Sequence, residues 1–236
     1  MKERRRTQTA IRCLAAIAGL AAASYASYVG ITWLRHGHVT PSTGDEVDSL
    51  LDQFMPTYEV VERHQAQVAA PAEVTLTAAS EMDIQRPIIV RALFKGRAMV
   101  LGSKSEEVER PRALLAWMQS LGWSLLVENP GRQVVVGTVM RPWEPNATPR
   151  ILSSAEFAAF HEPKYVKIVS TWAAEPIGPS DSQLTIATRV STTDATSRRL
   201  FRRYWSVFSP GSLLIRYVGL NLVKHEAERR ARTETS

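Results

Sequence analysis

Cysteine is nearly absent from this chain, which contains only Cys13 among its 236 residues. One thiol cannot form an intramolecular disulfide or a site with several thiolate ligands. The chain also lacks a glycine-rich phosphate loop, a His-Glu-x-x-His motif, a cysteine–histidine cluster, an internal repeat and a low-complexity tract. We therefore expect no metal and no cofactor, and no motif assigns a catalytic residue.

In the middle of the chain, basic residues are fewer than acidic residues, although the whole protein carries a net charge of +6. Residues 41–195 contain fourteen Lys and Arg against nineteen Asp and Glu, so the positive excess lies at the two ends. A nucleic-acid-binding protein more often carries a basic stripe interleaved with aromatic residues. We expect no nucleic-acid partner, and the C-terminal arginines form either a solvated helix face or a basic patch.

Charged residues are missing from one long segment, 13–34. Its 22 residues exceed the roughly 20 that a helix needs to cross the hydrocarbon core of a bilayer. Tyr25, Tyr28 and Trp33 lie in its C-terminal half, where an interfacial aromatic belt is expected. The pattern predicts one transmembrane helix over 13–34, preceded by a basic segment over 1–12.

The charges on either side of this segment predict its orientation. Five Lys and Arg precede it, whereas Arg35 is soon followed by acidic residues from Asp45 onward. Because positive charge stays on the cytoplasmic side, we expect a single-pass membrane protein with a cytoplasmic N-terminus and a periplasmic or extracellular domain. Two alternatives stay open: a signal peptide cut after Ala26, which gives a secreted protein, and a buried helix.

Residues beyond 34 predict a linker, one domain and a short tail. Gly, Ser and Pro in 35–57 are typical of a juxtamembrane tether with one or two helical turns, and 232–236 is expected to be a disordered tail. The domain is predicted to have strands over 58–68, 123–128, 133–140, 165–174 and 183–191, and helices over 71–82 and 105–121. Segment 88–94 fits a strand or a helix, and 153–160 fits a short helix or a loop.

The stretch from Ala195 to about Ala231 is the longest amphipathic run of the sequence. Four aromatic residues share one helical face at spacings of i, i+3, i+4 and i+7: Phe201, Tyr204, Trp205 and Phe208. Pro210 lacks an N–H and precedes Gly211, so we expect the helix to kink or restart there. This aromatic face needs a broad apolar cover, and we expect the strands to wrap around it.

The order of strand, helices, successive strands and one long helix predicts an α+β fold. Three segments resemble the START and Bet v 1-like superfamily, also called SRPBCC or polyketide cyclase/lipid-transport proteins. They are VAAPAEV at 68–74, WSLLVENPGRQVVVGTVMRPW at 123–143 and TRVSTTDATSRRLFRRYWSVFSPGSLLIR at 188–216. The resemblance covers about 58–231 and is strongest to bacterial members. It implies a helix-grip fold, in which a curved antiparallel sheet wraps around a long C-terminal helix, with an apolar cavity between them.

Strand alternation indicates which side chains would face such a cavity. On 183–191, Ile186 and Thr188 share one face with Leu184 and Val190, and Arg189 lies on the other. The apolar candidates for the lining are Trp172, Tyr204, Trp205, Phe201, Ile186 and Val136, and simple core packing is the alternative for each. The polar candidates are Glu128, Arg91, Arg189 and His161.

Three functions follow from these features. The first is a membrane-anchored, non-catalytic module that binds a lipid or another apolar small molecule in the cavity. The second is a cyclase- or hydrolase-type enzyme in the same cavity, which would need a buried polar pair with perturbed pKa values. The third is an interaction protein that uses Arg198, Arg199, Arg202 and Arg203 to contact anionic lipid head groups or a protein partner. The lipid bilayer is the partner that the sequence indicates, and no protein partner can be named from it.

Overall fold

The computed structural model describes residues 12, 16, 19–20, 23–32, 40–41, 48–103 and 110–234. Its labelled elements are β1 (Thr40–Pro41), α2 (Ser49–Phe54), β2 (Thr57–Tyr58), β3 (Val60–Val68), α3 (Ala72–Glu81), α4 (Ile88–Leu101), α5 (Leu114–Ser120), β4 (Ser124–Asn129), β5 (Gln133–Met140), α6 (Ser154–Ala159), β6 (Val166–Pro176), β7 (Ser182–Thr192) and α7 (Ala195–Glu234). Residues 23–32 are also helical. The fold is α+β, as the sequence predicts.

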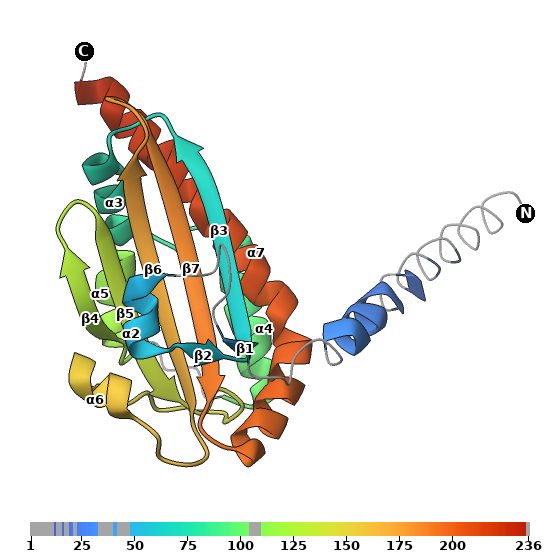
Figure 1. Cartoon of the computed structure of the whole chain (residues 1–236). Coiled ribbons are helices and arrows are strands. Elements are labelled where there is room, and N and C mark those ends of the chain that lie inside the picture. Colours follow the sequence, from blue (N-terminus) through green and yellow to red (C-terminus); the bar gives the residue numbers. More distant parts are fainter. Residues whose placement is uncertain are drawn as a thin grey trace, which may run out of the picture.

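Five strands form one antiparallel sheet in the order β3-β7-β6-β5-β4, and the long helix α7 crosses one of its faces (Figure 1). We call this side the α7 face. It carries the largest apolar core, to which α3, α5 and α7 contribute. The opposite, outer face carries a second core beneath α2 and α6. An antiparallel sheet closed by a long C-terminal helix fits the helix-grip architecture.

The two segments that the sequence left ambiguous are both helical. Segment 88–94 belongs to α4, which starts after Pro87 and stops at Gly102, whose φ of 68° is the left-handed conformation that ends many helices. Segment 153–160 contains α6, which opens with a capping box between Ser153 and Glu156. The β-branched residues at the start of α4 favour a strand. Pro87 before α4 and Gly102 after it are the signals that indicate a helix.

Helix α7 runs without a break through Pro210, so of the two alternatives expected at this residue, a kink or a restart, the restart does not occur. The helix axis instead bends in its N-terminal half (Figure 1). Proline removes one backbone hydrogen bond, but burial on both sides of it holds the helix together, with Phe201 and Trp205 before it and Val223 after it.

The ends of α7 are also defined. Asp194 precedes its first turn and accepts the backbone N–H of Ser197 at 2.6 Å, a hydrogen bond that lowers the pKa of the Asp194 carboxyl. The helix continues to Glu234, so residues 232–234 of the expected tail are helical.

Residues 48–58, expected to end a tether, pack across the outer face of the sheet. Asp48 caps α2 by accepting the backbone N–H groups of residues 50 and 51, and Leu51 and Phe54 are buried. Arg189, 1% exposed, reaches this segment from β7. Its Nη1 donates to Asp52 Oδ1 at 2.5 Å and to the carbonyl oxygen of residue 55 at 3.0 Å, and its guanidinium lies 4.9 Å from the ring centroid of Tyr58. The segment is therefore part of the folded domain.

Lys167 is buried in the outer core, and its burial makes the free energy of unfolding depend on pH. Its Nζ donates to the carbonyl oxygen of Ala158 at 3.1 Å and lies 5.0 Å from the ring centroid of Phe157. Burial lowers the pKa of Lys167 to about 8. Between about pH 8 and pH 10.5 the unfolded chain therefore holds a proton that the folded chain has released, so the free energy of unfolding rises with pH in this window.

We expect Lys167→Met to raise the free energy of unfolding at pH 7 by up to about 3 kcal/mol and to flatten its pH dependence above pH 8. Urea unfolding at several pH values measures both effects. The exposed Lys95 provides the control, because Lys95→Met should change neither quantity. Lower stability of Lys167→Met at pH 7 would contradict the prediction.

The predicted transmembrane segment 13–34 is described only in part, at residues 16, 19–20 and 23–32, and most of 1–12 and 35–47 lies outside the described residues. Within the described part of the chain, no helix has the length and apolar character needed to cross a bilayer.

Candidate binding cavity

A cavity of about 760 Å³ lies between the α7 face of the sheet and helices α4 and α7. Most of its lining is apolar or aromatic. Strands β5, β6 and β7 supply the floor, α4 and α7 supply two walls, and the indole side chains of Trp117 and Trp123 close a further side. Tyr25, from the helical segment 23–32, also reaches the lining. The volume falls within the range of about 300–1,000 Å³ that is typical of small-molecule sites.

Strand alternation builds the floor as the sequence predicts. On β6, Ile168, Ser170 and Trp172 point to the α7 face, and on β7 Ile186 and Thr188 do the same. Trp172 lies opposite Ile186, and Ser170 lies opposite Thr188, because the two strands pair antiparallel in this register. The side chains on the odd-numbered positions of these strands point to the outer face.

The aromatic face of α7 forms a wall. Phe201 stacks on Trp205, with ring centroids 5.6 Å apart. The ring centroids of Tyr204 and Phe208 are 4.8 Å apart. Arg97 of α4 bridges to this wall, since its Nε donates to the Tyr204 hydroxyl at 2.9 Å. Its Nη2 donates to the carbonyl oxygen of residue 142 at 3.0 Å. The hydroxyl of Tyr204 is thereby held in place at the cavity surface.

A polar band crosses the otherwise apolar floor. Ser170 Oγ and Thr188 Oγ1 share a hydrogen bond of 2.9 Å, and Thr188 lies directly opposite Glu62 of β3. Glu62 forms an ion pair with Arg216 of α7, whose Nη1 also donates to Ser212 Oγ at 3.1 Å. The band therefore runs from the centre of the sheet to the helix that closes it.

Arg216 is the charged end of this band and lines the cavity. Burial lowers the pKa of its guanidinium to about 10, so the group stays charged at neutral pH. Its hydrogen bond to Ser212 and its ion pair with Glu62 both use Nη1, and among the described residues no hydrogen bond is formed by Nε or Nη2. Since Arg216 lines the cavity, these N–H groups can donate to an oxygen atom of a bound molecule.

His64 lies on the same face of β3 as Glu62, two residues further along the strand and opposite Ile186. Its Nε2 is buried and has no hydrogen-bond partner among the described residues. Burial lowers the pKa of the His64 imidazole, so the ring is neutral at pH 7. His64 does not contribute to the cavity lining itself.

The structure brings together most of the apolar residues that the sequence selected. The cavity lining includes Trp172, Tyr204, Trp205, Phe201 and Ile186. Val136 lies on the same face, opposite Ser170, but is fully buried in the core beneath the lining.

The four polar candidates lie outside the cavity. Arg189 projects from the opposite face of the sheet, because it is one residue out of phase with Thr188. Glu128 is exposed at the end of β4, and His161 is exposed after α6. Arg91 is exposed on α4, where Nη1 bonds the carbonyl oxygens of residues 85 and 86.

Sequence reasoning missed Arg97 and Arg216, which line the cavity, and Glu62, which forms an ion pair with Arg216. The alternation of β3 could have placed Glu62 on the α7 face, since Glu62, His64 and Ala66 share one side of that strand. No sequence signal pairs Glu62 with Arg216, because the two residues are far apart along the chain.

Comparisons with known proteins give similarity only at the level of structure. No protein-family profile and no curated protein sequence matches the chain. Similar solved structures include a conserved protein from Geobacillus kaustophilus, at 11% identity over 72% of this chain and 96% of that protein, with a TM-score of 0.34. The Zhui aromatase/cyclase from a Streptomyces species is 16% identical over 72% of this chain and 94% of its own, with a TM-score of 0.24. Norcoclaurine synthase from Thalictrum flavum is 12% identical over 78% and 94%, with a TM-score of 0.26.

Proposed function

We propose that the protein is a binding module for a hydrophobic small molecule that carries at least one oxygen acceptor, lipids included. The observation that supports this most directly is Arg216, a charged donor that lines a mostly apolar cavity and whose Nε and Nη2 form no hydrogen bond among the described residues. An apolar body would fill the space between Trp172 and the aromatic wall of α7. A carbonyl, ester or carboxylate oxygen would meet the guanidinium.

The chemistry of the lining favours binding over catalysis. Among the described lining residues there is no carboxylate, histidine, cysteine or lysine, and the charged groups are Arg97 and Arg216. General acid–base and nucleophilic mechanisms usually recruit one of the missing types. A cyclase-type enzyme is the second candidate, because the Tyr204 hydroxyl, held by Arg97, is an O–H group that could donate a proton inside the cavity.

We propose further that the module is membrane-anchored through 13–34, with its N-terminus in the cytoplasm and its domain outside. The uncharged run of 22 residues and the five preceding basic residues support this arrangement. Secretion after signal-peptide cleavage is the alternative, and the mass of the mature N-terminus distinguishes the two.

Native mass spectrometry of the full chain, released from lipid nanodiscs, tests the binding function. We expect an additional non-protein mass that is lost on denaturation. In Gly96→Trp this mass should fall at least about tenfold in occupancy, since Gly96 lines the cavity and a Cβ there would meet no atom within 4 Å, leaving the indole to occupy the ligand space.

The matched control is Ile177→Trp, which adds an indole at an exposed position outside the cavity lining. It should keep the ligand mass of the unchanged protein. A bare protein mass for the unchanged chain, or equal occupancy in Gly96→Trp, would overturn the proposed function.

A further inference from the structure

The outward side of α4 is apolar. Ile88 and Met99 are 75% and 81% exposed, and Ile89 and Val100 are exposed beside them. Helix α4 has no acidic residue, and Lys95 and Arg91 are the charged residues that are exposed on it. Helices on a water-facing surface usually place polar residues outward, so this pattern marks a contact surface.

The apolar surface surrounds the opening of the cavity. Met99 and Val100 of α4 are exposed and also line the cavity, and the same holds for Val207 and Leu214 of α7. Tyr217, 64% exposed, extends the α7 side by one turn. These side chains form the rim through which a ligand would enter, and we call them the cavity rim.

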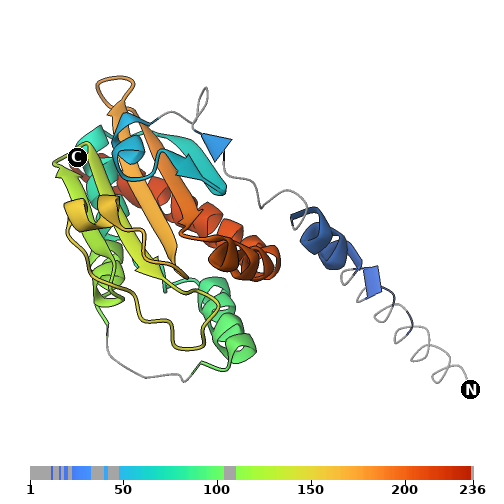
Figure 2. The same cartoon turned by 60° about the horizontal axis from the view of Figure 1, so that its bottom comes forward.

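The helical segment 23–32 meets the domain at this rim. The Tyr25 hydroxyl donates to the carbonyl oxygen of Val207, and the Tyr28 hydroxyl lies 3.4 Å from Ser209 Oγ. Figure 2 shows α4 and the N-terminal part of α7 on the side of the domain from which the helical segment projects. The apolar N-terminal run therefore approaches the domain where the cavity opens.

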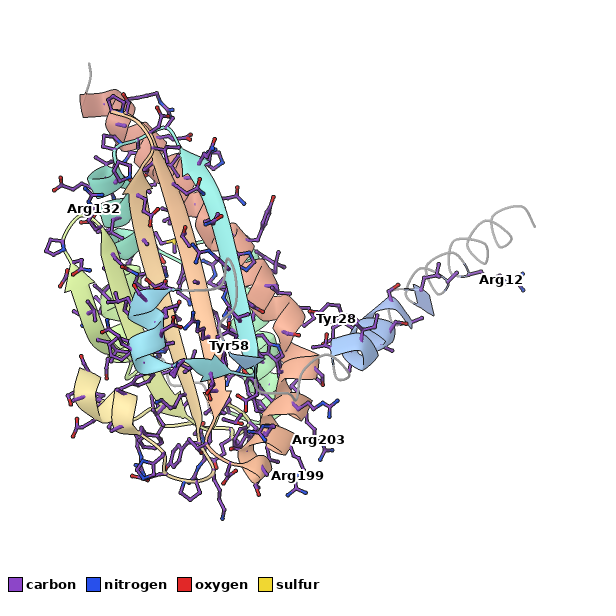
Figure 3. All side chains as sticks on the ribbon, viewed as in Figure 1. Arg12, Tyr28, Tyr58, Arg132, Arg199 and Arg203 are labelled. Carbon is purple, nitrogen blue, oxygen red and sulfur yellow. The ribbon has the colours of Figure 1, made fainter. Side chains whose placement is uncertain are left out.

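Basic residues border the rim, and the parts of its two helices that lie near the rim lack acidic residues. Arg199 and Arg203 are exposed about one to two turns before the rim residue Val207 and project outward on the side where Tyr28 lies (Figure 3). Neither α4 nor residues 195–225 contain Asp or Glu. An apolar centre flanked by helix segments whose charged residues are all basic matches the acyl region and head groups of an anionic lipid surface.

We propose that the cavity rim docks on a lipid bilayer that contains anionic phospholipid, so that a ligand passes between the bilayer and the cavity without crossing water. The route of the ligand rests on the proposed function, whereas the docking itself does not. A second copy of the chain fits this surface poorly, since it would bring the arginines of two rims together, and neither α4 nor residues 195–225 hold an acid to pair with them.

Site-specific fluorescence in vesicles tests the docking on the full chain. In a Cys13→Ser background, Met99→Cys or Leu214→Cys carries an environment-sensitive dye, and Ile177→Cys provides an exposed apolar control outside the cavity lining. In vesicles with roughly one-third phosphatidylglycerol, lipid-borne quenchers should quench both rim labels at least about threefold more than the control label.

Charge variants test the basic border. Arg199→Glu with Arg203→Glu should reduce the bilayer contact of the rim labels severalfold, because each basic side chain near an anionic surface contributes about fivefold in affinity. Phosphatidylcholine vesicles and high salt should have the same effect. Arg132→Glu, exposed at the β4–β5 turn, is the charge-matched control and should change nothing (Figure 3).

Two results would overturn the proposal. One is a Met99 label that is quenched no more than the Ile177 label in anionic vesicles. The other is a rim label that is already shielded from water without vesicles and in a protein-concentration-dependent manner, which would assign the rim to self-association. The native mass measurement is independent of both, so the docking and the ligand can fail separately.

Discussion

Replacing Arg216 with methionine is expected to lower the free energy of unfolding by about 3–5 kcal/mol. The loss arises at Glu62, whose side chain is 12% exposed and which forms an ion pair with Arg216. Without the guanidinium, its carboxylate would remain charged in an apolar surrounding. Urea unfolding of the full chain, followed by tryptophan fluorescence, measures the change.

The double variant Arg216→Met with Glu62→Leu separates the structural role of the pair from its role in binding. Apolar residues of similar size commonly replace a buried ion pair with little loss, so most of the stability should return. The ligand mass should stay absent, because the donor for its oxygen atom is gone. Arg229→Met is the control on the same helix, since its ion pair with Glu226 is exposed and its loss should leave stability nearly unchanged.

Two outcomes would contradict this assignment. Unchanged stability of Arg216→Met would mean that Glu62 does not depend on its partner. A double variant that is stable and still carries the ligand would show that the guanidinium is not the polar contact of the site.

Replacing Glu59 with alanine is expected to lower the free energy of unfolding by about 3 kcal/mol or more. Glu59 is buried between β2 and β3, and its carboxylate accepts the backbone N–H of Thr192 at 2.8 Å and Nε of Arg198 at 2.9 Å. Thr192 ends β7 and Arg198 lies in the first turn of α7. The carboxylate thus fixes the junction from which the aromatic wall of the cavity extends.

Hydrogen exchange distinguishes this local role from a general loss of packing. In Glu59→Ala, amide protons in the first turns of α7 should exchange faster than those of the helix beyond Pro210, because the helix is released at its start. Glu128→Ala, at an exposed carboxylate, should leave both stability and exchange unchanged. Equal acceleration along all of α7 would contradict the proposed role of the junction.

The cavity illustrates how far side-chain patterns lead. The spacing of Phe201, Tyr204 and Trp205 predicts one apolar helical face, and strand alternation predicts that Trp172 and Ile186 share a face. These patterns depend only on local backbone geometry, so they place the aromatic lining correctly. They give no distance between elements, so they do not show how far the polar candidates Arg189 and Glu128 lie from the cavity.

Period and turn chemistry act over a few residues, so the amino-acid pattern predicts the α+β class, the strands of the sheet and the apolar faces, and it leaves α4 and α6 ambiguous. The folded structure is needed to show that Glu62 meets Arg216, that residues 48–58 cover the outer face, and that α4 lies at the mouth of the cavity. Such contacts depend on register and on how the sheet curves around α7. Both are set by packing over the whole domain, which no local pattern encodes.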